Sequence, residues 1–275
     1  MRDLKRRLEL ALEAADMAPW DAHPAFEREY FRLYAMPIVS LAARARETHD
    51  EVLIRMVSEN GELILPDAFI PAAERYGLMP ALDRWVIRAV CQHIKSVRDA
   101  LPALVAFEQS HTRTPALYSV NLSEASLGDA GLHDYITGQF VLHEVAPEQI
   151  CFEITETAAV ANLPRTQAFM MQLKALGCRF SLDDFGSALS SFGSLKVLPV
   201  DYLKIDGILV RDLARNPVSL AMVKAINDVG HAMGMLTVAE YVEDRAALDA
   251  VRELGVDYAQ GHAAGTLRPL QAGCD

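Results

Sequence analysis

The chain has 275 residues, of which 51% are hydrophobic and 23% charged, and this composition excludes a disordered or fibrous protein. Its formal net charge of −11 excludes a general nucleic-acid scaffold, because such proteins carry basic surfaces and the densest basic run here is LKRRLE near the start. The same charge predicts that duplex nucleic acid is not a partner. No apolar run reaches about 18 residues, so no membrane-spanning segment is predicted.

The N-terminal stretch MRDLKRRLELALEAADMAP lacks the uninterrupted apolar core of a signal peptide. Leu4, Leu8 and Leu12 fall on one face of a helix, which predicts either a helix docked on its own domain or a connector to an upstream sensory domain or a dimer partner. The cysteines show no Cys-x-x-Cys spacing, so we interpret them as reduced thiols of a cytoplasmic protein. They are Cys91, Cys151, Cys178 and Cys274.

Beyond residue 29 strand-like and helix-like patterns alternate along the chain. Strands are predicted at 30–39, 50–56, 116–123, 149–156, 178–185, 201–206, 236–242 and 256–261. Helices are predicted at 66–77, 80–101, 124–144, 165–177, 217–234 and 244–255. This α/β alternation indicates parallel strands joined by helical crossovers, and about eight strands at this length favour a closed (β/α)8 barrel over an open sheet.

Polar side chains stand at the ends of six successive predicted strands. They are Asn121, Glu153 with Glu156, Asp183 with Asp184, Lys204 with Asp206, Glu240 with Glu243, and Gln260. One polar strand end is usually a helix cap, but six in a row point to the carboxyl end of a barrel, where active sites are built. Carboxylate and amide oxygens select Mg²⁺ or Mn²⁺ over zinc, so this rim is predicted to bind metal.

The adjacent pair Asp183 and Asp184 ends the strand RFSLDDF. Alone, such a pair is a turn or a helix cap. Among the other carboxylates it suits two cations about 3.5–4 Å apart, the arrangement used for phosphoryl displacement. Lys204 alone would be a salt-bridged lysine, but in this setting it would orient or deprotonate a water molecule.

These motifs resemble those of the bacterial EAL-domain phosphodiesterases. EVLIRM, VNLS, FEITE, DDFG, LPVDYLKID, AEYVE and DYAQG occur in that family's order between about residues 31 and 270. The resemblance implies a modified (β/α)8 barrel with its first strand antiparallel, a homodimer, and hydrolysis of cyclic di-GMP to linear pGpG with two Mg²⁺ or Mn²⁺ ions. It divides the chain into an N-terminal helix or connector (1–28), an EAL domain (29–270) and a tail (271–275).

The resemblance also implies a role for each matching residue. The implied metal ligands are Glu51, Asn121, Glu153, Asp183, Asp184 and Glu240. The implied catalytic residues are Lys204, which positions the attacking water, Glu156, which steadies the loop after DDFG, and Glu243. The implied substrate-binding positions are Arg55, which meets a phosphate, Gln260 and Met36.

The chain departs from the family pattern at several positions. Val52 replaces the alanine of Glu-Ala-Leu, Met36 stands where glutamine is common, and Ala188 and Tyr241 stand where glycine is common. The complete metal set favours a phosphodiesterase. Two alternatives are a catalytically weak or inactive module that acts as a cyclic di-GMP receptor through a partner protein, and an unrelated metal-dependent barrel such as an aldolase.

Overall fold

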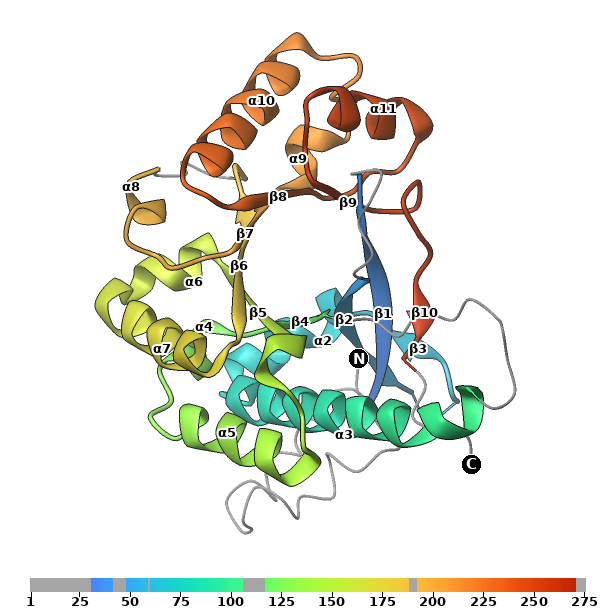
Figure 1. The fold of residues 1–275 in the computed structure, drawn as a ribbon, viewed down its shortest axis with the longest axis vertical. Helices are drawn as coiled ribbons and strands as arrows, with labels where there is room; N and C mark the ends of the chain where they lie inside the picture. The colour runs from blue at the N-terminus through green and yellow to red at the C-terminus, as the bar shows by residue number, and fades with distance from the viewer. Residues whose placement is uncertain (1–30, 42–47, 59, 106–116, 188–191, 271–275) are drawn as a thin grey trace.

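The computed structural model describes residues 31–41, 48–58, 60–105, 117–187 and 192–270. Within these ranges eight strands close into a barrel, which Figure 1 shows end-on. The strands are β1 (Phe31–Ser40), β2 (His49–Val57), β4 (Leu117–Asn121), β5 (Ile150–Thr155), β6 (Arg179–Phe185), β7 (Tyr202–Ile205), β8 (Leu236–Ala239) and β9 (Tyr258–Gln260). The predicted N-terminal helix, Ala188 and Cys274 lie outside the described residues.

The direction of the strands matches the expectation that only the first is reversed. β1 pairs antiparallel with both β2 and β9, and the other barrel pairs, from β2–β4 round to β8–β9, are parallel. Two short strands extend the sheet at its ends: β3 (Leu63–Ile64) pairs with β2, and β10 (Arg268–Pro269) pairs with β1. The predicted modified (β/α)8 barrel is therefore confirmed.

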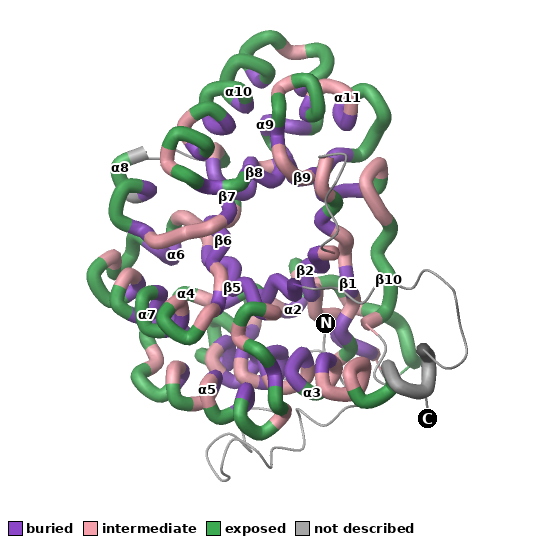
Figure 2. The backbone as a smooth tube through the Cα atoms, in the orientation of Figure 1, coloured by how far each residue is buried: buried purple, intermediate pink, exposed green. Residues whose placement is uncertain are grey.

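Helices pack around the outside of the barrel, and their inner faces are buried while their outer faces are exposed (Figure 2). They are α2 (Pro66–Arg75), α3 (Met79–Val105), α4 (Glu124–Leu127), α5 (Leu132–His143), the 3-10 helix η3 (Pro147–Gln149), α6 (Glu156–Ala161), α7 (Leu163–Leu176), α8 (Phe192–Leu195), α9 (Gly207–Val210), α10 (Pro217–Ala232) and α11 (Arg245–Glu253). Leu173 of α7 and Phe180 of β6 are fully buried in the layer between helices and barrel. In the part of the chain that is described, none of the helices combines the length and apolarity that crossing a bilayer requires.

The predicted helix over 124–144 is wrong as a single element. It is divided into α4 and α5 by a turn in which the Asp129 side chain accepts a hydrogen bond from the backbone N–H of Gly131 at 2.8 Å. Arg84 of α3 donates to the same carboxylate at 2.5 Å and so ties the turn to its neighbour. Two glycines flank this aspartate, which is a turn signal that outweighed the helical periodicity.

Gly261, the residue after β9, is the glycine that this rim of the barrel requires. Its φ is +139°, and an added Cβ would lie 2.5 Å from both the backbone N and the backbone O of Val242. Val242 donates to the Gln260 carbonyl at 2.9 Å, so the close approach locks the segment after β8 to the end of β9.

We expect Gly261→Ala to lower the free energy of unfolding by about 2–4 kcal/mol, because it adds left-handed strain to a backbone clash. The matched control is Gly138→Ala on α5, where a Cβ meets nothing within 4 Å and should stabilise the helix by about 0.5–1 kcal/mol. Urea unfolding of both variants measures the difference. Equal stability of the two variants would show that the contact between Gly261 and Val242 does not require glycine at position 261.

Candidate active site

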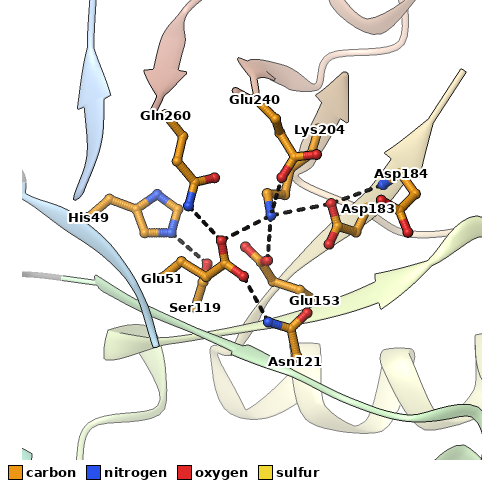
Figure 3. A network of polar contacts seen from close by, with 10 residues as sticks. All are labelled: His49, Glu51, Ser119, Asn121, Glu153, Asp183, Asp184, Lys204, Glu240 and Gln260. Carbon is orange, nitrogen blue, oxygen red and sulfur yellow. Dashed lines mark hydrogen bonds and ion pairs between the residues drawn. The ribbon is translucent and has the colours of Figure 1, made fainter. Parts of the chain in front are cut away.

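The inward-facing side chains at the carboxyl ends of the strands converge on one polar cluster (Figure 3). Successive residues of a strand point to opposite faces, so the last inward residue of each strand reaches the same level of the barrel. The register supports this, because Glu51 lies opposite Ser119, and Asn121 lies opposite Glu153 on the next strand. The cluster contains Glu51, Asn121, Glu153, Asp183, Lys204, Glu240 and Gln260.

Lys204 occupies the centre of the cluster, and its side chain is only 1% exposed. Its Nζ lies 2.8 Å from carboxylate oxygens of Glu153 and Glu240. It also lies 3.2 Å from Asp183 and 3.3 Å from Glu51. Burial on its own would lower the pKa of Lys204, but the four carboxylates, with Asp183 foremost, raise it well above its usual value. The side chain is therefore an ammonium ion at neutral pH.

Glu51 is the carboxylate with the most complete set of hydrogen-bond donors. Asn121 Nδ2 donates to Oε1 at 2.8 Å, and Gln260 Nε2 donates to Oε2 at 2.5 Å. Burial raises the pKa of Glu51, but the charge of Lys204 and these hydrogen bonds more than offset it, so the pKa lies below the usual value. Glu51 is ionised in this arrangement.

Glu153 and Glu240 differ from Glu51, because burial and neighbouring carboxylates raise their pKa values. Glu153 is 1% exposed and its Oε1 has no hydrogen-bond partner. Burial, followed by the charges of Glu51 and Asp183, raises its pKa to about 8 despite the attraction of Lys204. Burial and Asp183 likewise raise the pKa of Glu240 well above its usual value. The single charge of Lys204 thus does not neutralise the four carboxylates, and the buried Glu153 Oε1 is left without a hydrogen-bond donor.

The two adjacent aspartates reach the same site because β6 is irregular at its end. The β6–β7 register shifts between Leu182 and Phe185, and Asp184 adopts the left-handed conformation with φ of 57°. The Asp184 backbone N–H donates to Asp183 Oδ1 at 2.9 Å. One oxygen from each of Asp183, Asp184 and Glu240 lies within 4.8 Å of the others. The two adjacent aspartates of the sequence therefore both reach the acidic cluster.

This donor set fits divalent cations. It consists of carboxylate and amide oxygens without thiols, it carries more negative charge than Lys204 offsets, and Glu153 Oε1 is buried without a partner. Of the predicted metal-binding residues, Asp183, Asp184 and Glu240 bring their oxygens within 4.8 Å of one another, and Glu51 and Glu153 join Asp183 and Glu240 around Lys204.

The other predicted residues lie around this cluster rather than in it. Glu156 begins α6 directly after β5, and Glu243 pairs with His262 in an exposed contact. Arg55 on β2 is partly buried, donates to the Ile54 carbonyl at 2.8 Å and lies 5.9 Å from the ring of Tyr34. Met36 on β1 is partly buried and lies opposite Glu51 in the β1–β2 register.

A second layer of polar side chains lies beneath the carboxylates and was not predicted from the sequence. His49 precedes Glu51 by two residues, is 5% exposed, and places Nε2 2.7 Å from Ser119 Oγ. Its ring packs against Tyr202 at 5.3 Å between centroids. The signal was available, because residues two positions before each cluster residue must face the same interior.

Comparison with known proteins identifies the family of the chain. Residues 21–266 match the family described as "EAL domain". The chain belongs to the EAL domain family. It is 41% identical to the cyclic di-GMP phosphodiesterase PdeB of Shewanella oneidensis over 91% of this chain, and 35% identical to PdeF of Escherichia coli over 90%. It spans 28% of the length of PdeB and 31% of the length of PdeF.

Solved structures of EAL domains share the fold. The EAL domain of FimX from Pseudomonas aeruginosa bound to c-di-GMP has a TM-score of 0.78 and 27% identity, covering 99% of both chains. A PaMucR phosphodiesterase in complex with c-di-GMP also has a TM-score of 0.78, with 29% identity and 97% coverage of both chains. The barrel of this EAL domain is thus the one that those proteins use.

We expect Lys204→Met to destabilise the protein by about 3–5 kcal/mol in the presence of a chelator, because it leaves buried carboxylates without their counter-ion. Adding Mn²⁺ should restore part of this loss. The control is Lys224→Met, whose pair with Asp228 is exposed and contributes less than about 1 kcal/mol. Thermal unfolding with and without Mn²⁺ measures both. A Lys204→Met variant as stable as the wild type in chelator would contradict this account of the cluster.

We expect the affinity for Mn²⁺ to rise with pH between about 6 and 8. In the folded protein Glu153 keeps its proton up to a pKa of about 8, whereas the unfolded chain loses it near the usual value of 4.5. Stability without metal should therefore fall as pH rises between those values, and metal binding must displace the proton. Titration calorimetry in buffers of different ionisation enthalpy counts the proton released. An affinity that is flat from pH 6 to 8 would show that Glu153 is already ionised.

Proposed function

We propose that this EAL domain hydrolyses cyclic di-GMP to linear pGpG with the help of two Mg²⁺ or Mn²⁺ ions. The observation that carries the proposal is the buried cluster in which four carboxylates surround one ammonium ion and Glu153 Oε1 has no partner. The names of PdeB and PdeF support the same substrate. The chain spans about a third or less of those proteins, so the activity is proposed for the domain described here.

The ligand residues divide into two groups that share Asp183. Asp183, Asp184 and Glu240, whose oxygens lie within 4.8 Å of one another, would hold one ion. Glu51, Asn121, Glu153 and Asp183, which are linked by the contacts of Lys204 and of Asn121, would hold the other. Divalent cations at such a site neutralise the phosphodiester and make a water molecule more acidic. Neutralisation is needed because both the substrate and the rim of the barrel are anionic.

Lys204 would orient rather than deprotonate the attacking water. Its pKa lies well above the usual value, so it is a donor and not a base at neutral pH. The water oxygen forms a bond to phosphorus, the bond from phosphorus to the ribose 3′-oxygen breaks, and that oxygen takes up a proton. Glu153 holds its proton near pH 7 in the metal-free site, so it is not assigned as the base, and the proton that the water loses balances the one that the 3′-oxygen takes up.

The residues around the cluster have supporting roles in this proposal. Arg55 would donate a charge-assisted hydrogen bond to a phosphate oxygen. Gln260 holds Glu51 in place, and Glu156 would steady the segment after DDFG from the start of α6. Glu243 would border the rim of the barrel, where it pairs with His262. Met36 cannot donate a hydrogen bond where the family commonly has glutamine, so one substrate contact is lost.

We further propose a homodimer, an upstream sensory domain and a cytoplasmic location. The resemblance implies the dimer, and the greater length of PdeB and PdeF leaves room for other domains in proteins of this kind. The cysteines that the structure describes, Cys91, Cys151 and Cys178, are free and buried, which fits a reducing compartment. Sedimentation of the purified chain tests the dimer directly.

We expect the purified protein to convert cyclic di-GMP to pGpG with Mg²⁺ or Mn²⁺, and Glu51→Ala to lower kcat at least about 100-fold while the fold stays intact, because a ligand on the barrel rim is lost. The control is Glu62→Ala, an exposed glutamate before β3. Chromatography of the products, with and without chelator, gives the rates.

Tight binding of cyclic di-GMP without any product would support the receptor alternative, for which the methionine at position 36 is the specific observation. Wild-type turnover by Glu51→Ala would show that the metal assignment is wrong. Absence of both binding and turnover would contradict the proposed substrate.

A further inference from the structure

Tyr241 has an unusual backbone for a bulky residue. It directly follows Glu240 at the end of β8, and its φ is 50°, in the left-handed region that favours glycine. Such conformations persist only where surrounding contacts hold them, and they concentrate at functional sites. Since glycine is common at this position in the family pattern, the tyrosine side chain is a distinguishing feature of this chain.

The ring of Tyr241 is held from one direction by α9. A Cβ added to Gly207 would lie 2.3 Å from the ring, so the ring rests directly on the backbone at the start of this helix. The Arg211 guanidinium lies 4.4 Å from the ring centroid. Residues 207 and 211 are four apart and share one side of the helical turn. Although supported in this way, Tyr241 is still 50% exposed.

Tyr241 lies at the rim that carries the acidic cluster. It follows Glu240 directly after β8, and its ring contacts Gly207, which begins α9 two residues after β7. β7 and β8 are neighbours in the barrel, and the ion pair of Lys204 with Glu240 joins their ends. The ring therefore stands beside the carboxylates of the candidate site.

Arg55 and Arg211 come from opposite sides of the barrel. Arg55 is on β2 and Arg211 follows β7 through α9, and the strand order places three strands between β2 and β7 in either direction round the barrel. Each arginine lies beside a tyrosine, Arg55 at 5.9 Å from Tyr34 and Arg211 at 4.4 Å from Tyr241.

We propose that the exposed face of Tyr241 is a stacking platform for one guanine base of cyclic di-GMP, braced by Gly207 and Arg211. This inference rests on the proposed function of the site. A base stacks on an aromatic ring regardless of its hydrogen-bonding edge, and such contacts commonly contribute about tenfold or more in affinity. The platform would hold one base at the rim while the phosphodiester lies over the carboxylates.

The test compares aromatic and aliphatic side chains at one backbone position. Tyr241→Leu keeps the left-handed strain and much of the volume but removes the ring, and we expect it to raise KM for cyclic di-GMP about tenfold with a smaller effect on kcat. The conservative Tyr241→Phe should restore KM to within about twofold of the wild type. Gly207→Ala should raise KM as Tyr241→Leu does, because the added Cβ displaces the ring.

The matched control is Tyr76→Leu, a partly exposed tyrosine at the end of α2, which should leave KM unchanged. Equal KM values for Tyr241→Leu and Tyr241→Phe, with normal turnover, would overturn the platform and leave the proposed function standing. A fall in melting temperature and kcat without a change in KM would show that Tyr241 is only a structural brace. A wild-type protein that neither binds nor hydrolyses cyclic di-GMP would overturn the proposed function, and the platform with it.

Discussion

The site depends on one buried ammonium ion among four carboxylates. Transfer of even one such carboxylate from water into the barrel is costly unless it is paired. Lys204 pairs with Glu51, Glu153, Asp183 and Glu240, and its own burial is tolerated only because they surround it. The charges do not balance, however, and burial together with the charges of Glu51 and Asp183 raises the pKa of Glu153 to about 8. The excess negative charge suits this rim to binding cations.

The closed barrel is the geometry that can bring these groups together. Three of the four carboxylates belong to three different strands, Glu240 directly follows β8, and the lysine comes from β7. An open sheet would spread them along an edge, whereas closure of β1 onto both β2 and β9 turns the edge into a ring. The layer below, with His49 hydrogen-bonded to Ser119, fills the interior so that the carboxylates cannot collapse inward.

The sequence predicted the regular parts of this arrangement and missed the irregular ones. Strand alternation and polar strand ends were sufficient to place Glu153, Asp183 and Lys204 at one rim, because parallel strands share their carboxyl ends. The turn at Asp129 was missed, because the sequence has helical periodicity both before the turn, in α4, and after it, in α5. The pairing of Glu243 with His262 was also invisible, because it depends on a loop conformation and not on a period.

The irregular positions are also the ones that enlarge the site beyond what a regular barrel offers. A regular strand directs only every second residue inward, so it supplies a single side chain at each level. The left-handed conformation of Asp184 brings a second carboxylate from β6 to the oxygens of Asp183 and Glu240. Tyr241 uses the same device after β8 to lay a ring on Gly207. The left-handed backbone at these two residues thus adds two side chains to this rim, and the absence of a Cβ at Gly207 leaves room for the ring of Tyr241.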